Sequence, residues 1–191
     1  MNKKLKISII GVKGYPYVYG GFETLIKELV ERLIHKNVDI TVYCHRGLFK
    51  ERPPVYNNVK LVYVPSIELK SFTQLVHSLL STLHACFCKN DVIFYVNAAN
   101  GPFGLITRLF RKKTVINVDG MEWLRPKWKG IGVKYFYFAA KQATKNFDLL
   151  VTDAFEMQKT YLELFNKKTT MIAYGADTVE GASVDLIEQW G

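Results

Sequence analysis

The sequence predicts an α/β fold, a Rossmann-like three-layer sandwich in which a mostly parallel sheet lies between two layers of helices. Short apolar, β-branched runs alternate with stretches of helical periodicity throughout the 191 residues. The first run enters a glycine-rich loop that opens a long amphipathic helix, an order that presents backbone N–H groups to a phosphate. Apolar residues make up 49% of the chain and charged residues 23%, which suits one globular core.

Seven runs are expected as strands. Short runs rich in β-branched residues, separated by helices, are typical of buried strands that pair in parallel. A seven-stranded, mostly parallel sheet with helices on both faces follows. The expected strands are Lys6–Ile10, Asp39–Cys44, Val59–Val64, Val92–Val96, Thr114–Val118, Leu149–Thr152 and Thr170–Ala173.

Helices are expected between these strands. The first is marked by apolar residues at spacings of three and four from Leu25 to Ile34. Four more are expected at Phe72–Cys88, Phe103–Phe110, Ile131–Asn146 and Ala154–Phe165. We assign residues 1–177 to the Rossmann-like domain and residues 178–191, which have too few apolar residues for another domain, to a linker stub.

Basic residues are concentrated in one part of the chain. The net charge is +9, and Gly104–Lys145 holds ten basic residues against two acidic ones. Such clustering favours an anionic partner, namely lipid headgroups, a pyrophosphate or nucleic acid, although a solvated face remains an equal alternative. The predicted membrane or anion patch consists of Arg108, Arg111, Lys112, Lys113, Lys127 and Lys129.

Several classes of protein are disfavoured. The three cysteines are odd in number and suggest no disulfide framework, so a cytoplasmic location is expected. The apolar runs fall short of the roughly 20 residues that span a bilayer. The four histidines lack the spacing of metal ligands, so no metal site is expected. A serine hydrolase is disfavoured because Gly-x-Ser-x-Gly is missing.

The first loop carries glycines at 11, 14, 20 and 21. Their spacing is neither a dinucleotide fingerprint nor a Walker loop, which weakens a nucleotide-binding oxidoreductase as an alternative. Gly20 and Gly21 form a pair at a helix start, where missing side chains let an anionic group approach the backbone amides. A purely structural turn is the alternative.

A second loop, after the fifth expected strand, is denser in chemistry. It contains Asp119, Glu122, Trp123 and Arg125. A carboxylate at a strand end can orient or deprotonate a sugar hydroxyl, and indoles form platforms for sugar rings. The alternatives are that Asp119 caps a turn and that Trp123 belongs to the core.

A third loop follows the fourth expected strand and contains Asn97 and Asn100. These amides can line the same cleft, because ligands gather beyond the carboxyl ends of parallel strands. The alternative is a helix start with Pro102 near its first position. Asp153, after the sixth strand, presents the same two alternatives, and a helix N-cap is the favoured one.

Three motifs together resemble the amino-terminal, acceptor-side half of bacterial glycosyltransferases of family 4, in particular the rhamnosyltransferase-like subgroup. They are the stretches 14–24, 119–128 and 172–177, in matching order over nearly the whole chain. The resemblance implies one half of a GT-B fold, with Gly20 and Gly21 beside the donor diphosphate. Asp119 stands where many relatives have a catalytic histidine, and we take Asp119 and Glu122 as catalytic candidates. Asn97, Asn100, Trp123 and Arg125 are assigned to the acceptor cleft.

The resemblance also implies a reaction. A retaining, metal-independent enzyme would transfer a hexosyl or deoxyhexosyl group, with rhamnose as a candidate, from a nucleotide-sugar to a lipid-linked glycan in polysaccharide synthesis. It would need no cofactor besides that co-substrate, and no nucleic acid is expected. The chain would lie at the inner face of the plasma membrane. As a fragment or split half it would need a second domain, in trans if necessary, to be active. The alternative is a non-catalytic module that binds anionic membranes or nucleic acid.

Overall fold

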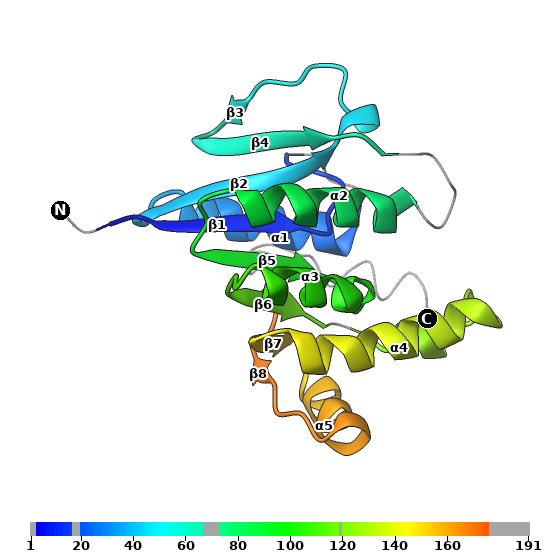
Figure 1. Cartoon of the computed structure of the whole chain (residues 1–191). Helices are drawn as coiled ribbons and strands as arrows, with labels where there is room; N and C mark the ends of the chain where they lie inside the picture. The colour runs from blue at the N-terminus through cyan, green and yellow to red at the C-terminus, as the bar shows by residue number, and fades with distance from the viewer. Residues whose placement is uncertain (1–2, 17–19, 67–72, 119, 176–191) are drawn as a thin grey trace, which may run out of the picture.

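A computed structural model of the chain describes residues 3–16, 20–66, 73–118 and 120–175. Its centre is an eight-stranded sheet with the strand order β3-β4-β2-β1-β5-β6-β7-β8. Every pairing is parallel except that of β3 with β4. The predicted linker stub, 178–191, lies outside the described residues. The α/β, Rossmann-like fold class is therefore confirmed (Figure 1).

All seven expected strands form, and an eighth joins them. The strands are β1 (Leu5–Ile10), β2 (Val38–His45), β3 (Val55–Tyr56), β4 (Val59–Val64), β5 (Val92–Val96), β6 (Thr114–Asn117), β7 (Leu149–Thr152) and β8 (Thr170–Met171). The unpredicted strand, β3, has two exposed residues and runs antiparallel to β4 at the edge of the sheet. Two residues are too few to show strand periodicity.

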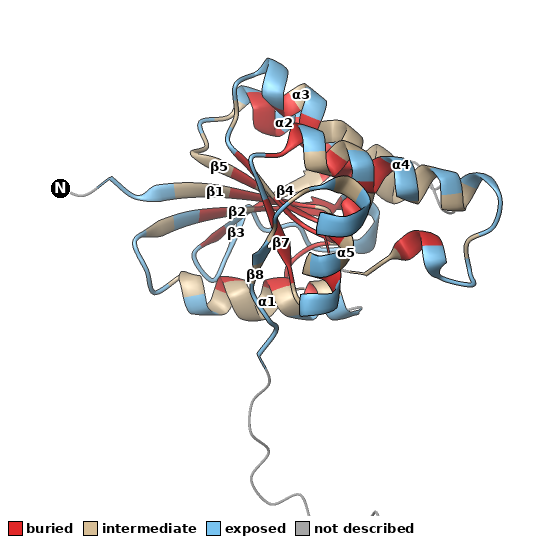
Figure 2. Ribbon diagram, turned by 90° about the horizontal axis from the view of Figure 1, so that it is seen from below, coloured by how far each residue is buried: buried red, intermediate tan, exposed pale blue. Residues whose placement is uncertain are grey.

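The five helices form where periodicity placed them. They are α1 (Gly21–Leu33), α2 (Thr73–Phe87), α3 (Gly104–Leu109), α4 (Ile131–Asn146) and α5 (Phe155–Phe165), with short 3-10 turns η1 (Arg46–Leu48), η3 (Ala98–Phe103) and η4 (Glu122–Leu124). Helix α1 covers one face of the sheet, and α2, α3 and α4 cover the other (Figures 1 and 2). In the described parts of the chain, no helix is long and apolar enough to cross a membrane.

Two apolar cores lie on the two faces of the sheet. On the α1 side, Ile26 and Val30 pack with Ile9 and Val42 from the central strands. On the other side, a larger cluster joins the sheet to α2, α4 and α5 and includes the buried Tyr95. Figure 2 shows how the buried residues concentrate on the strands. The sheet is therefore rigid enough to present its edge loops at fixed positions.

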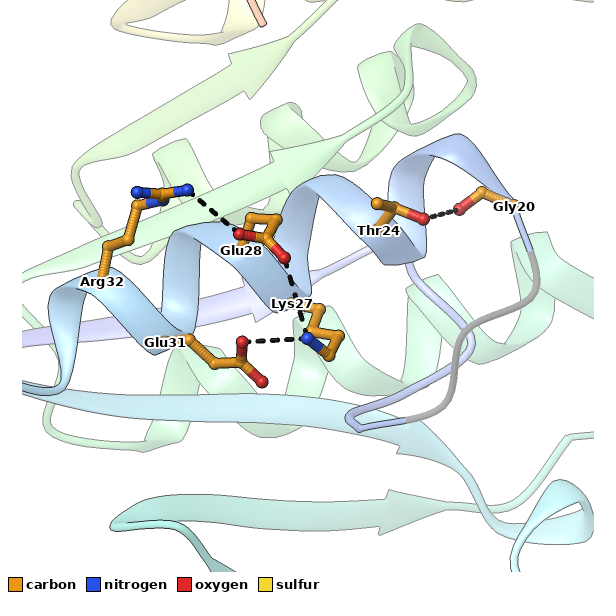
Figure 3. A network of polar contacts seen from close by, with 6 residues as sticks. All are labelled: Gly20, Thr24, Lys27, Glu28, Glu31 and Arg32. Carbon is orange, nitrogen blue, oxygen red and sulfur yellow. Dashed lines mark hydrogen bonds and ion pairs between the residues drawn. The ribbon is translucent and has the colours of Figure 1, made fainter. Parts of the chain in front are cut away.

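Helix α1 carries all its charged side chains except Glu23 at least partly exposed on its outer surface. Lys27 pairs with Glu31 at 2.9 Å, and Arg32 pairs with Glu28 at 3.2 Å (Figure 3). Each pair lies four residues apart and contributes about 0.3–0.5 kcal/mol to the helix. At the start of the helix, Thr24 Oγ1 donates to the carbonyl of Gly20 at 3.2 Å. This hydrogen bond fixes the carbonyl of Gly20 at the first turn of the helix.

Candidate functional site

The direction of the chain across the sheet reverses at β1. From β1 the chain runs outward to β2 and β4, and α2 then carries it back to β5 on the other side of β1. Open α/β sheets bind their ligands beyond the carboxyl ends of the strands at such a switch point. The candidate site is therefore the carboxyl edge above β1 and β5, with β6 as the next strand.

Gly11 brings the loop after β1 directly against the loop after β5. Its φ is +106°, and a Cβ placed on it would lie 2.4 Å from the carbonyl oxygen of Val96 and 2.8 Å from Nδ2 of Asn100. Only glycine allows this backbone conformation and this approach together. The two loops thus form one continuous floor at the switch point.

Asn97 and Asn100 shape this floor from the β5 side. Asn97 has a φ of 77°, and its Oδ1 accepts from the amide of Ala99 at 2.8 Å, which caps η3. A helical turn therefore starts directly after β5, but Pro102 lies at its fifth position and not near its first, as the alternative had it. Asn100 is 2% exposed, and its Nδ2 donates to the carbonyl of Val96 at 2.6 Å. Its Oδ1 has no hydrogen-bond partner among the described residues.

Gly20 and Gly21 leave open space at the start of α1. Gly20 is the N-cap in an extended conformation, and a Cβ placed on Gly21 would meet no heavy atom of the described residues within 4 Å. Glu23, buried in the first turn, accepts through Oε1 from the backbone amide of Lys13 at 3.2 Å. This bond ties the loop after β1 to the helix. Gly20 and Gly21 are exposed, and the described part of the preceding loop is tied to the helix at Lys13.

Asp119 lies outside the described residues, so its catalytic role stays a prediction. The residues on either side of it, Val118 and Gly120, are described. Val118 is fully buried, and its amide donates to the carbonyl of Val151 at 2.8 Å. Gly120 has a φ of +68° and makes the turn away from the strand. Because β6 lies two strands from β1, these two strands are roughly 9–10 Å apart.

Glu122 organises the loop that follows. Its buried carboxylate accepts from Trp128 Nε1 at 2.9 Å and pairs with Arg125 at 3.0 Å and Lys127 at 3.4 Å. Two cations and one indole thus converge on one side chain inside a single loop. This geometry holds the loop in shape, and the catalytic assignment of Glu122 stays a prediction.

Trp123 and Arg125 differ in exposure, because the first is buried and the second lies on the surface. Trp123 is 8% exposed and packs edge-on against Tyr137 and Phe165, with ring centroids 5.8 and 6.2 Å apart. The structure thus places it in the core, which the sequence left open as an alternative. Arg125 is exposed, and its guanidinium lies beside Gly120, 3.7 Å from the position of an added Cβ. Of the two, Arg125 is the side chain available to a ligand.

Sequence reasoning missed a contact from the segment after β8. The hydroxyl of Tyr174 donates to Oδ1 of Asn117 at 3.4 Å, at the end of β6. The backbone carbonyl of Asn117 also accepts from the amide of Asn97 at 3.1 Å. Tyr174 belongs to the third motif, 172–177, but the topology of the sheet decides that it contacts Asn117.

The sequence also did not predict a cavity at the same edge of the sheet. A cavity of about 450 Å³ lies beyond β1, β2 and β4 and is lined by Lys13, His45, Gly47, Leu48, Ser66, Thr73 and Gln74. His45 ends β2, and its Nε2 donates to Oε1 of Gln74 at 3.0 Å. The sequence does contain a sign of this cavity, because the loop after Cys44 follows the carboxyl end of an expected strand. His45 alone, however, forms no motif with a recognisable spacing to other polar residues.

Behind His45 lies a second, buried histidine. The ring of His77 stacks on that of His45 with centroids 3.8 Å apart. Burial, and then the neighbouring His45, lower the pKa of His77 to about 3. Burial also lowers the pKa of His45. Both rings are therefore neutral near pH 7. Within the described residues, no three His, Cys, Asp or Glu side chains gather closely enough to hold a metal ion.

The predicted basic patch is divided between the two ends of α4. Lys127 and Lys129 precede the first residue of the helix, whereas Arg108 donates to the carbonyl of Lys145 in its last turn. These ends are about 24 Å apart, given 1.5 Å of rise per residue. Arg111, Lys112 and Lys113 follow Arg108 and precede β6, at the amino edge of the sheet. The six cations therefore do not form one surface.

Comparison with solved structures identifies the fold. The chain superposes on sucrose-phosphate synthase from Thermosynechococcus elongatus with a TM-score of 0.73 at 15% identity, covering 96% of this chain and 53% of that one. It superposes on HepE from Anabaena, in complex with UDP and glucose, with a TM-score of 0.60 at 16% identity, covering 98% and 50%. UGT89C1 from Arabidopsis thaliana, complexed with UDP-L-rhamnose, gives 0.54 at 14% identity, covering 100% and 55%.

These superpositions define the class of the fold. The domain is one Rossmann-like half of a GT-B glycosyltransferase fold, and it spans about half the length of these neighbours. By sequence, the chain belongs to the family described as Domain of unknown function (DUF1972), whose model matches residues 4–177. No curated protein matches the sequence.

Proposed function

We propose that this domain is the acceptor-side half of a glycosyltransferase. The observation that carries the proposal is the superposition of nearly the whole chain on one half of enzymes that use or bind nucleotide-sugars. The domain also has a topological switch point at β1 and β5, and α/β proteins bind ligands at the carboxyl edge of such a point. The proposal further includes retention of configuration and transfer of a hexosyl or deoxyhexosyl group, with rhamnose as the first donor to test.

The start of α1 is proposed to stabilise the leaving diphosphate. The site is open above Gly21, and the amides of the first turn point out of the helix start. Amides and a positive helix end stabilise negative charge as it develops on the leaving group. Glu23 lies in the same turn, but its carboxylate is bound to the amide of Lys13. We therefore assign Glu23 the role of positioning the loop after β1 next to the proposed diphosphate site.

Asp119 is proposed to orient the acceptor hydroxyl. It directly follows the buried Val118 and precedes the turn at Gly120. Glu122 would act with it by holding the loop through Arg125, Lys127 and Trp128, which makes a positioning role its better-supported one. General acid or base assistance of this kind contributes about 10²–10⁴ in rate.

The acceptor is proposed to be a lipid-linked glycan at the inner face of the plasma membrane. The cavity lined by Lys13, His45 and Gln74 offers a cation, a neutral imidazole and an amide at the edge where the acceptor would bind. Such groups recognise sugar hydroxyls through hydrogen bonds. A second, donor-binding half is proposed to complete the enzyme, in cis or in trans.

The test is a transfer assay on the purified protein, supplemented with a donor half if it is inactive alone. UDP- and dTDP-linked glucose and rhamnose serve as donors, a membrane extract supplies lipid-linked glycans, and release of nucleoside diphosphate is measured. Asp119→Ala is expected to lower turnover by about a hundredfold or more. Gly21→Val is expected to lower it about tenfold, and it should fold because no atom opposes the new side chain.

Asp39→Ala is the matched control, because Asp39 lies at the opposite edge of the sheet and pairs with Lys4 at 3.2 Å. It should retain full turnover. Unchanged turnover in both site variants would remove the proposed site. Failure of every donor in the supplemented assay would overturn the function and leave a non-catalytic module as the better description.

A further inference from the structure

Helix α2 presents its side chains in an unusual orientation. The residues buried against the sheet are polar or small, namely His77, Ser78, Ser81, Thr82, Ala85 and Cys86. The residues on the outer surface include Leu80, Leu83 and Phe87, which lie on one stripe of the helix. A helix on the surface of a soluble domain ordinarily shows the reverse arrangement.

The buried polar groups of α2 are only partly satisfied. Thr82 Oγ1 lies 2.8 Å from the hydroxyl of Tyr95. The hydroxyls of Ser78 and Ser81 and both ring nitrogens of His77 have no hydrogen-bond partner among the described residues. The outward position of the leucines and Phe87 is therefore not explained by better polar contacts inside. It is explained if the outer surface is itself covered by an apolar medium.

Helix α3 extends the exposed apolar surface. Leu105 and Leu109 lie four residues apart on α3, and Leu109 is 76% exposed. Phe110, just after the helix, packs edge-on against Phe87 with ring centroids 5.1 Å apart. The two helices therefore share one surface, which we call the α2–α3 face and define by Leu80, Leu83, Phe87, Leu105, Leu109 and Phe110.

Cations border this face, and acidic residues are almost missing from the segment that builds it. Residues 73–118 contain Asp91 as their one carboxylate, and it is paired with Lys3 at 3.0 Å. Basic residues stand in the last turn of α3 or follow the ends of α2 and α3, namely Lys89, Arg108, Arg111, Lys112 and Lys113. Lys112 and Arg108 donate to the backbone carbonyls of Cys88 and Lys145 at helix ends, but both keep their positive charge.

We propose that the α2–α3 face docks onto an anionic lipid bilayer. Exposed leucine and phenylalanine side chains enter the acyl–headgroup boundary, and the bordering cations lie at the level of the lipid phosphates. A second copy of this chain is the less suitable occupant, since a symmetric contact would bring the same cations on both copies together. Lys127 and Lys129, at the far end of α4, take no part.

This docking leaves the proposed active edge free. The α2–α3 face belongs to the helical layer, whereas the proposed site lies beyond the carboxyl ends of the strands. The inference rests on the proposed function only for the reason to dock, which is access to a lipid-linked acceptor. Vesicle binding and sugar transfer are separate measurements, so one can fail without the other.

The first experiment changes one exposed apolar residue at a time. The natural protein is sedimented with phosphatidylcholine vesicles, with or without phosphatidylglycerol. We expect binding to the anionic vesicles and a loss of about tenfold or more for Phe87→Asp and Leu109→Asp. Phe155→Asp is the matched control, because Phe155 is 72% exposed against 78% for Phe87 and lies on α5, at the β7–β8 edge. It should bind as the natural protein does.

The second experiment compares two pairs of cations. The double variant Arg111→Gln, Lys113→Gln should weaken binding about tenfold or more. The double variant Lys127→Gln, Lys129→Gln makes the same change in charge at the other end of α4 and should have little effect. The reverse ranking would overturn the proposal.

Three further results would overturn the proposal. They are equal binding to neutral vesicles, an equal loss with Phe155→Asp, and a dimer in sedimentation velocity that Phe87→Asp dissociates. Circular dichroism confirms that each variant is folded. Transfer to a soluble acceptor should be unchanged in Phe87→Asp, which separates loss of docking from loss of the active site.

Discussion

Asn97 and Glu122 show why a polar residue just after a strand is an ambiguous sign of function. Asn97 uses its side chain to cap η3, and Glu122 uses its carboxylate to hold Arg125, Lys127 and Trp128. Both act within their own loops. Loops at a carboxyl edge must satisfy their backbone and fix their shape before they can position a ligand.

Replacement of Glu122 should loosen its loop. Glu122→Gln keeps an acceptor for Trp128 but loses the ion pairs with Arg125 and Lys127, so we expect a loss of about 1–3 kcal/mol in the free energy of unfolding. Urea denaturation measures it. Glu163→Gln, on an exposed position of α5, should change stability by less than about 0.5 kcal/mol. Equal effects of the two variants would contradict the assigned contacts.

The buried His77 should make stability depend on pH. Its pKa is about 3 in the folded chain and 6.5 when unfolded, so below pH 6.5 the unfolded chain binds more protons. Stability from this group is complete above pH 6.5 and falls as the pH drops towards 3, by up to about 1.4 kcal/mol per pH unit. Denaturation at several pH values measures the slope. His77→Leu should flatten it, while the exposed His35→Leu should not.

At the scale of elements, periodicity located the helices well but did not reveal their orientation. The stretch 72–88 was expected as a helix and forms α2, yet the pattern does not show that its leucines face outward. Periodicity locates a stripe of similar side chains, and tertiary packing decides which stripe is buried. The same reasoning explains the missed β3 and 3-10 turns, which are too short to carry a period.

The contact between η3 and α4 depends on a glycine. A Cβ placed on Gly101 would lie 1.9 Å from the carbonyl oxygen of Ala139 and 2.8 Å from the amide of Ala143. Gly101→Ala must push α4 away, so we expect a loss of at least about 2 kcal/mol in the free energy of unfolding. Thermal unfolding measures it. Gly47→Ala, where no atom lies within 4 Å, should be neutral, and a neutral Gly101→Ala would refute the close approach.

At the scale of the whole molecule, the sequence predicted the edge that holds the candidate site more securely than the residues in it. Alternation of strands and helices implied parallel pairing, and hence a common edge for the loops after β1, β5 and β6. The strand order is not encoded in any local pattern, so the contacts of Asn117 with Tyr174 and of His45 with Gln74 could not be foreseen. In the same way, the motif around Trp123 does not show whether this side chain faces the cleft or the core, and the structure places it in the core.

The boundary at residue 177 can be tested on the whole chain. The match to the family model ends at residue 177, and the segment after it has few apolar residues. Deletion of residues 178–191 should therefore leave the midpoint of thermal unfolding unchanged within about 2 °C, because little core is removed. Calorimetry measures the midpoint. A large fall would place these residues in the domain.

The position of β1 has a consequence for synthesis of the chain. Among the strands of this sheet it is the first to be synthesised, yet it lies in the middle of the sheet, between β2 and β5. One of its edges pairs early with β2, which begins at Val38, while the other waits for β5, which begins at Val92. During that interval a nascent half-sheet exposes an unpaired apolar edge, the kind of surface that chaperones shield.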